Sequence, residues 1–204
     1  MDAAARTVFY VNDTGEDRTA LLRLLTSVDY QVRTFESAER FLEEQDAERP
    51  GCMLVDICLP GMSGLDLQRS LVGSPRARSI VFLSGTSDIN TAVNAMKQGA
   101  VDYLTKPIDE LRLLAAVEEA LQRDAEQREQ RAIRSAIRQR VATLTRRERE
   151  VMMHVIRGLL NKHIAVEVGA GEKTVKVHRM RVMRKMGVSS VAELVRLTAR
   201  VGVS

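Results

Sequence analysis

The stretch MLVDICLPGMSGLDL, residues 53–67, carries the pattern from which we predict the fold of the first half of the chain. A short apolar run, Cys52–Ile57, carries the carboxylate of Asp56 near its end, and Pro60-Gly61 and Gly64 follow it. An apolar run of this length bounded by loop-forming residues is typical of a buried strand. We therefore expect Asp56 to stand at the end of a strand, beside a tight loop.

Similar runs recur on both sides of this one, and amphipathic stretches with helical spacing separate them. The predicted strands are Val8–Val11, Gln31–Phe35, Cys52–Ile57, Ile80–Ser84 and Asp102–Thr105. A fifth helix is expected to open near Asp109. Regular alternation of strand and helix predicts a doubly wound α/β domain, in which helices cover both faces of a five-stranded parallel sheet.

The strand pattern disappears in the second half of the chain. Thr145 with Glu148 forms a capping box that opens a helix. Asn161 is expected to cap a short helix that runs to Val168, and a second helix is expected from Glu172 to about Met186. A short Gly-Ala-Gly turn joins them, which is the pattern of a helix-turn-helix. Ser190 and Glu193 open a last helix, so we predict an all-α domain of four helices.

These patterns predict three parts along the chain. Residues 1–123 form the α/β domain and residues 142–204 form the helix-turn-helix domain. Residues 124–141 are rich in Glu, Arg, Gln and Ala, which favour a helix but give it little to bury, so we interpret them as a helical linker.

Charge is distributed unevenly between the two halves. The net charge of +4 combines 13 basic and 20 acidic residues up to Asp124 with 18 basic and 7 acidic residues after it. The basic half is suited to a polyanion such as nucleic acid.

Nothing in the chain predicts export or membrane insertion. No run of about 18 apolar residues occurs, and the N-terminus lacks the apolar core of a secretion signal. Cys52 and Cys58 flank a strand and would lie about 20 Å apart, too far for a disulfide. We expect both to be buried, reduced thiols in a cytoplasmic protein.

Polar side chains lie at or just past the ends of four predicted strands, at the edge where a doubly wound sheet carries its functional crevice. They are Asn12, Asp13, Asp56, Ser84 and Lys106. A carboxylate at position 56 can act as a nucleophile toward phosphorus, and a magnesium ion fits an all-oxygen site. Each residue alone could be a helix cap, a turn residue or a loop charge, but their joint placement favours phosphoryl transfer.

The segments VFYVND, MLVDICLPGMSGLDL, IVFLSG and GAVDYLTKP resemble a receiver domain of the flavodoxin-like fold, of the FixJ type, over residues 7–123. The resemblance implies that Asp56 is the phospho-acceptor and that a sensor histidine kinase supplies the phosphate. It implies that Asp13, Asp56 and the backbone carbonyl of Cys58 ligate Mg²⁺. It further implies a switch formed by Ser84, Tyr103 and Lys106, with a cis peptide bond before Pro107.

One position departs from the receiver pattern. Receivers usually have two adjacent acidic residues where this chain has Asn12 and Asp13, and the first of them acts on the metal through water. We expect weaker Mg²⁺ binding without loss of phosphorylation; the alternative is a receiver that works without phosphorylation. A phosphatase of the haloacid-dehalogenase type would need a second carboxylate two residues after its nucleophile. Position 58 is Cys, which cannot serve as that acid or base, so the sequence argues against such a phosphatase.

The helix EKTVKVHRMRVMRKM, residues 172–186, is basic around a buried stripe of Val175, Val182 and Met186, as suits the major groove of DNA. Residues 144–188 are similar to the DNA-binding domain of LuxR/NarL/FixJ-type regulators, although Gly171 stands where that family has a capping Ser or Thr. The resemblance implies base-edge contacts from Lys176, Val177 and Met180. The implied backbone contacts come from Lys162, Thr174, Arg179 and Arg181.

Together these features predict a two-component response regulator of the FixJ/NarL/LuxR type. Phosphorylation of Asp56 is expected to control homodimerisation and sequence-specific binding to double-stranded DNA. We do not expect an enzyme, beyond the part the chain takes in its own phosphotransfer and dephosphorylation. Two alternatives stay open: a constitutive DNA binder, and a receiver whose output helices bind RNA or protein.

Overall fold

The computed structural model describes residues 7–13, 15–44, 46, 49–74 and 77–203. The chain divides into two compact units, Met1–Arg128 and Glu129–Ser204. Within the described residues, no helix combines the length and the hydropathy needed to cross a membrane.

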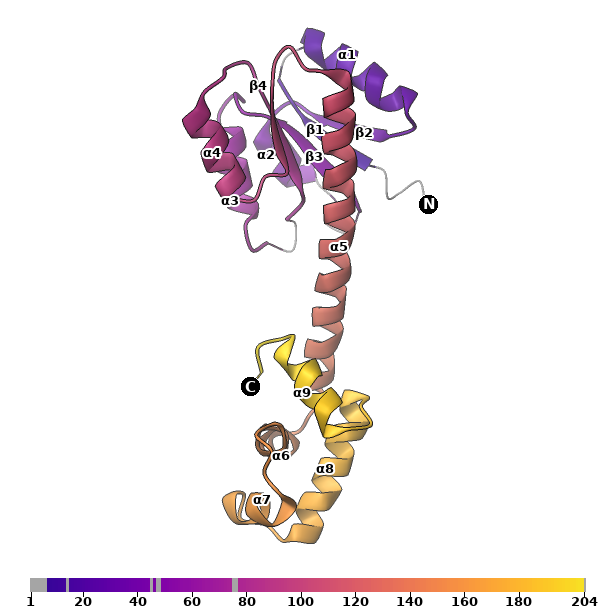
Figure 1. The fold of residues 1–204 in the computed structure, drawn as a ribbon, viewed down its shortest axis with the longest axis vertical. Helices are drawn as coiled ribbons and strands as arrows, with labels where there is room; N and C mark the ends of the chain where they lie inside the picture. Colours follow the sequence, from indigo (N-terminus) through magenta and orange to yellow (C-terminus); the bar gives the residue numbers. More distant parts are fainter. Residues whose placement is uncertain (1–6, 14, 45, 47–48, 75–76, 204) are drawn as a thin grey trace. The chain divides into compact units, whose positions relative to one another are not determined.

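The first unit is built on a five-stranded sheet whose strands are all parallel (Figure 1). The strands are β1 (Thr7–Val11), β2 (Gln31–Phe35), β3 (Cys52–Asp56), β4 (Ile80–Ser84) and β5 (Asp102–Thr105). Their order across the sheet is β2-β1-β3-β4-β5, which confirms the doubly wound α/β prediction. Every residue of β1, β3 and β4 is buried, as expected of strands covered on both faces.

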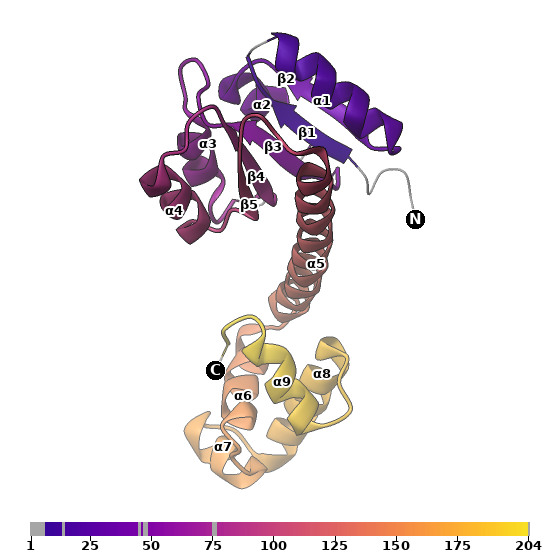
Figure 2. The same cartoon turned by 45° about the horizontal axis from the view of Figure 1, so that its top comes forward.

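Helices cover both faces of this sheet. They are α1 (Gly15–Ser27), α2 (Ala38–Glu44), α3 (Gly64–Leu71), α4 (Ile89–Lys97) and the first part of α5 (Glu110–Ala142). One core places α1 and α5 against the sheet through residues such as Leu25 and Leu113. The other core places α2, α3 and α4 on the opposite face, through residues such as Phe41, Leu67 and Ala95 (Figure 2).

Helix α5 is continuous from Glu110 to Ala142, so the residues predicted as a linker, 124–141, all lie within it. Asp124 fixes its middle to the first unit, because the Oδ2 atom of Asp124 accepts a hydrogen bond from the Gly51 N–H at 3.1 Å. The same oxygen lies 3.3 Å from Nε of Arg128. The helix is therefore anchored to the residue that precedes β3, at the end of the strand opposite Asp56.

The second unit is helical. After the end of α5 come α6 (Arg146–Ile156), α7 (Asn161–Glu167), α8 (Glu172–Met186) and α9 (Val191–Ala199), and they enclose one apolar core. The predicted capping box of Thr145 and Glu148 is present, and Ser190 caps α9. One cap differs from the prediction: the N-cap of α7 is Leu160 rather than Asn161, and it provides no side-chain hydrogen bond.

The two cysteines differ in environment. Both are free, and Cys52 is buried in β3, where burial raises the pKa of its thiol. Cys58 is exposed, so the expectation that both thiols are buried was wrong. The reason is that Cys58 lies two residues past the end of β3, in a loop that is no longer covered on both faces of the sheet.

Candidate phosphoryl-acceptor site and nucleic-acid interface

Asp56 and Lys106 meet at the carboxyl edge of the sheet. Asp56 ends β3 and is only 5% exposed, while Lys106 directly follows β5. Although β4 lies between these strands, Lys106 Nζ donates a hydrogen bond to Asp56 Oδ2 at 2.8 Å. The ammonium group thus compensates a buried carboxylate that has lost most of its hydration. The peptide bond between Lys106 and Pro107 is cis.

The other oxygen of Asp56 is held by the loop that follows it. The Cys58 N–H donates to Asp56 Oδ1 at 2.9 Å, and the Gly64 N–H closes the loop on the Ile57 carbonyl at 3.1 Å. A Cβ atom at Gly64 would lie 2.5 Å from the Asp56 carbonyl oxygen, so only glycine allows α3 to start this close to Asp56. The loop therefore orients the carboxylate with its backbone.

Asn12 and Asp13 reach the same edge from β1, which is the neighbour of β3. The Val11–Val55 pair is the last in the register of the two strands, so residues 12 and 13 follow at the level of Asp56. Asp13 is exposed and Asn12 is buried. The Asn12 side chain donates a hydrogen bond from Nδ2 to the Tyr10 hydroxyl at 2.5 Å.

The oxygen atoms at this edge fit a magnesium ion. The candidate ligands are the carboxylates of Asp13 and Asp56 and the carbonyl of Cys58, all of them hard oxygen donors. In the described ranges no cluster of three or more His, Cys, Asp or Glu side chains could hold a metal. Two carboxylates are nonetheless the usual protein share of a Mg²⁺ site, since phosphate and water supply the other ligands.

Ser84 and Tyr103 are connected through Thr86, which the sequence reasoning did not single out. Ser84 ends β4 and is fully buried; its hydroxyl donates to the Thr86 carbonyl oxygen at 2.9 Å. The Tyr103 hydroxyl donates to the same carbonyl oxygen at 3.5 Å, and the ring is 9% exposed. The signal in the sequence was the Ser-Gly-Thr turn, in which a Ser hydroxyl bonds the backbone two residues on.

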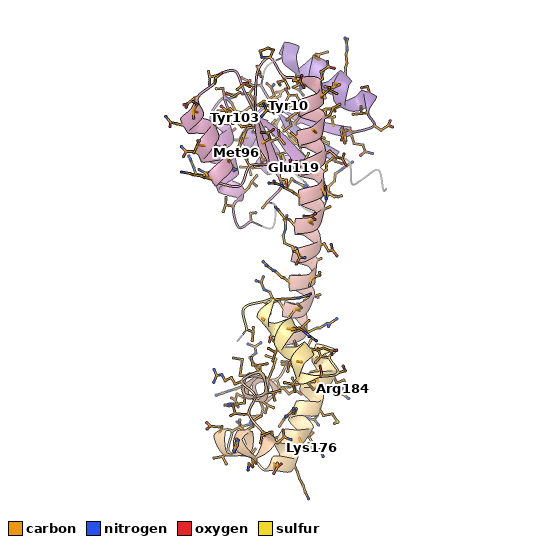
Figure 3. The ribbon with its side chains drawn as sticks, viewed as in Figure 1. Tyr10, Met96, Tyr103, Glu119, Lys176 and Arg184 are labelled. Atoms are coloured by element: carbon orange, nitrogen blue, oxygen red, sulfur yellow. The ribbon has the colours of Figure 1, made fainter. Side chains whose placement is uncertain are left out.

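Helix α8 presents a mixed basic and apolar surface to solvent. Val175, Val182 and Met186 are its buried stripe, as predicted. Gly171 is its N-cap and supplies no side-chain hydrogen bond. The exposed side chains are Glu172, Lys173, Thr174, Lys176, Val177, Met180, Arg181 and Arg184, and Figure 3 shows Lys176 and Arg184 on this helix.

Two basic residues of α8 have partners within the second unit. Arg179 is half-buried and donates from Nη1 to Asn161 Oδ1 at 3.0 Å, which joins α8 to the start of α7. Lys185 donates to Glu148 Oε2 at 2.6 Å and to the Thr143 carbonyl at 2.9 Å. The bond from Lys185 is the main reason that the pKa of the buried Glu148 carboxyl lies below its usual range. Lys185 therefore links α8 to α6 and to the residues before it, and its charge is already paired within the domain.

The other predicted DNA-contacting residue lies on α7. Lys162 is exposed in the first turn of that helix, near Asn161, where Arg179 joins α7 to α8. The structure thus brings Lys162 onto the helix pair that carries the other predicted contact residues. His178 is half-buried in α8, and among the described atoms its Nδ1 has no hydrogen-bond partner.

Comparison with known proteins places both units in one family. The "Response regulator receiver domain" family matches residues 8–118, and "Bacterial regulatory proteins, luxR family" matches residues 142–198. The chain belongs to the response regulator family. It is a response regulator transcription factor with a receiver domain and a helix-turn-helix DNA-binding domain.

Relatives match this response regulator over almost its whole length. It is 41% identical over 200 residues to response regulator protein TodT of Pseudomonas putida, a match that covers 98% of this chain and 88% of TodT. It is 39% identical to FixJ of Azorhizobium caulinodans, over 97% of this chain and 93% of FixJ. The structure of StyR, a response regulator, has a TM-score of 0.80 at 44% identity and covers 95% of this chain and 98% of its own.

Full-length FixJ from B. japonicum has a TM-score of 0.57 at 36% identity, with 97% of this chain and 98% of that chain covered. The comparisons confirm the FixJ-type resemblance.

Proposed function

We propose that this response regulator accepts a phosphoryl group on Asp56 from a sensor histidine kinase. The observation that carries the proposal is the contact between Asp56 and Lys106, which come from strands separated by β4. An ion pair buried at the carboxyl edge costs desolvation and adds little to stability, so a functional role explains it better than a structural one.

In the transfer, a carboxylate oxygen of Asp56 forms the new P–O bond while the bond from phosphorus to the donor nitrogen breaks, and the donor imidazole leaves with that electron pair. Lys106 is placed to stabilise the charge on the phosphoryl oxygens, because its ammonium group already contacts Asp56 at 2.8 Å. Mg²⁺ held by Asp13, Asp56 and the Cys58 carbonyl would neutralise the remaining phosphoryl charge. Asn12 leaves this site with one carboxylate fewer, so we propose weak Mg²⁺ binding.

The switch follows from the shared acceptor at Thr86. A phosphoryl group on Asp56 offers Ser84 a stronger, charged acceptor than the Thr86 carbonyl. When the Ser84 hydroxyl turns to it, the Thr86 carbonyl oxygen becomes available to Tyr103, whose own bond to that atom is long at 3.5 Å. Phosphorylation would thereby tighten Tyr103 in its inward position and alter the surface formed by α4 and β5, as a shift between two populated states.

We propose that this change favours a homodimer that places two copies of α8 on two half-sites of double-stranded DNA. One helix-turn-helix alone offers a small contact area and few phosphate contacts. Lys176, Val177 and Met180 would meet base edges, while Lys162, Thr174, Arg179 and Arg181 would contact the DNA backbone. Because the target is DNA, the protein would act in the cytoplasm.

A mobility-shift experiment tests the proposal. The probe is a duplex selected from a random-sequence pool by the protein itself, and binding is measured with and without acetyl phosphate and Mg²⁺. We expect acetyl phosphate to tighten binding by the wild type and to have no effect on the Asp56→Asn variant. Equal binding under all conditions would favour the receiver that works without phosphorylation. Failure to select any duplex would favour an output domain for RNA or protein.

A further inference from the structure

The carboxamide of Asn12 is held by a buried tyrosine. Tyr10 lies inside β1 and Asn12 follows its end; they are 0% and 1% exposed. Residues two apart on a strand face the same side of the sheet, and the Asn12 Nδ2 atom donates to the Tyr10 hydroxyl at 2.5 Å. Figure 3 marks Tyr10 among the strands of the first unit.

In this contact the nitrogen end of the Asn12 amide faces the Tyr10 hydroxyl, so the oxygen end is left for other partners. A carboxamide has a donor end, the NH₂ group, and an acceptor end, the oxygen, and the two have similar shapes. Next to a cation held by Asp13 and Asp56, the NH₂ end is repelled and the oxygen end is attracted. An amide can replace a carboxylate in such a site only if its nitrogen is directed elsewhere, and the Tyr10 hydroxyl accepts that nitrogen.

We propose that Tyr10 is a positioning residue for the Mg²⁺ site, which orients the Asn12 carboxamide so that its oxygen end serves the hydrated cation. The inference rests on the proposed function, in which Asp13 and Asp56 hold Mg²⁺. Tyr10 acts through Asn12 and does not itself touch the metal. A phenol is suited to this role because its oxygen accepts a hydrogen bond while its ring fills the apolar core beside Leu25 and Leu54.

The effect of Tyr10 should depend on the amide at position 12. Tyr10→Phe keeps the ring in the core and removes the hydroxyl that accepts from Asn12, so the amide loses this contact. We expect Mg²⁺ binding to weaken by about fivefold to tenfold, the equivalent of one ordinary hydrogen bond. In an Asn12→Ala background there is no amide to orient, so Tyr10→Phe should leave the Mg²⁺ dissociation constant unchanged.

The chain offers a matched control in Tyr30. It is also buried, at 6% exposure, and its hydroxyl donates to Glu118 Oε2 at 2.9 Å, a contact between α5 and the start of β2. Tyr30→Phe therefore removes a comparable hydrogen bond from the same unit without affecting β1 or the Asp56 edge. We expect it to leave Mg²⁺ binding unchanged.

The experiment is isothermal titration calorimetry of the full chain with MgCl₂ alone, on wild type, Tyr10→Phe, Asn12→Ala, the double variant and Tyr30→Phe. Far-ultraviolet circular dichroism and urea unfolding confirm that each variant is folded. The proposal is supported if Tyr10→Phe weakens Mg²⁺ binding in the wild-type background but not in the Asn12→Ala background. Tyr30→Phe should leave Mg²⁺ binding unchanged.

Three results would overturn it. The first is that Tyr10→Phe leaves Mg²⁺ binding unchanged, or changes it equally in the wild-type and Asn12→Ala backgrounds. The second is an Asn12→Ala variant that binds Mg²⁺ as tightly as wild type, which decides the matter even if Tyr10→Phe does not fold. The third is a wild type that binds no Mg²⁺; only that result also removes the metal site from the proposed function.

Discussion

Replacing Arg181 with Ala should reduce the salt dependence of DNA binding by a predictable amount. Arg181 is exposed on α8, and within the part of the chain that the structure describes it makes no hydrogen bond or ion pair. Arg179 and Lys185, on the same helix, are instead bonded to Asn161 and Glu148. Arg181 is therefore a basic side chain of α8 that can contact a phosphate without losing a partner within the protein.

The magnitude follows from counterion release. Each phosphate that a protein neutralises on duplex DNA contributes about −0.9 to the slope of log affinity against log salt concentration. A dimer on two half-sites carries two copies of Arg181, so the slope should become shallower by about 1.8. On doubling the salt concentration, the affinity ratio of wild type to variant should fall about 3.5-fold.

The assay is fluorescence anisotropy of a labelled selected duplex at several NaCl concentrations, with acetyl phosphate present. Arg200→Ala is the control, because it removes the same charge from an exposed position at the end of α9. We expect its slope to match wild type. A slope for Arg181→Ala equal to that of wild type, or an equal loss in Arg200→Ala, would refute a specific phosphate contact from Arg181.

Three further predictions concern the base contacts, the switch and the core of the second unit. Lys176→Ala should lose preference for the selected duplex over a scrambled one, by about 1–3 kcal/mol in competition binding; an unchanged preference would contradict the docking. Ser84→Ala should still take up phosphate, but acetyl phosphate should no longer tighten DNA binding; full tightening would exclude Ser84 from the switch. Glu148→Gln should destabilise the second unit to urea by about 1 kcal/mol at neutral pH, because it weakens a charge-assisted hydrogen bond to a Lys185 side chain that stays partly exposed. The pKa of Glu148 is lowered in the folded protein. Its contribution to the free energy of unfolding is therefore complete above the ordinary carboxyl pKa and is lost as the pH falls through the lowered value. The difference in stability between wild type and Glu148→Gln should vanish in acid.

The sequence was most informative where structure is local or periodic. The five strands, the caps at Thr145 and Ser190 and the buried stripe of α8 follow from hydrophobic spacing and from short-range hydrogen bonds. The carboxyl-edge residues could be predicted because parallel strands all end at the same edge. Asp56 and Lys106 are fifty residues apart in the chain, and their contact follows from this topology alone.

The features that the sequence did not reveal depend on tertiary contacts. The Glu148–Lys185 pair joins α6 to α8, and no spacing rule links residues so far apart in a helical domain. The role of Thr86 depends on the path of the loop after β4, where one carbonyl oxygen lies within reach of two hydroxyls. The contact between Tyr10 and Asn12 was accessible in principle, because residues two apart on a strand share a face.

The proposed function depends on Asp56 as the residue that receives the phosphoryl group. Intact-protein mass spectrometry after incubation with acetyl phosphate and Mg²⁺, followed by mapping of the modified peptide, tests this directly. We predict that the wild type gains the mass of one phosphoryl group on the peptide that contains Asp56, and that Asp56→Asn gains none. Equal phosphoryl uptake by Asp56→Asn, or modification of a different carboxylate in the wild type, would contradict the claim.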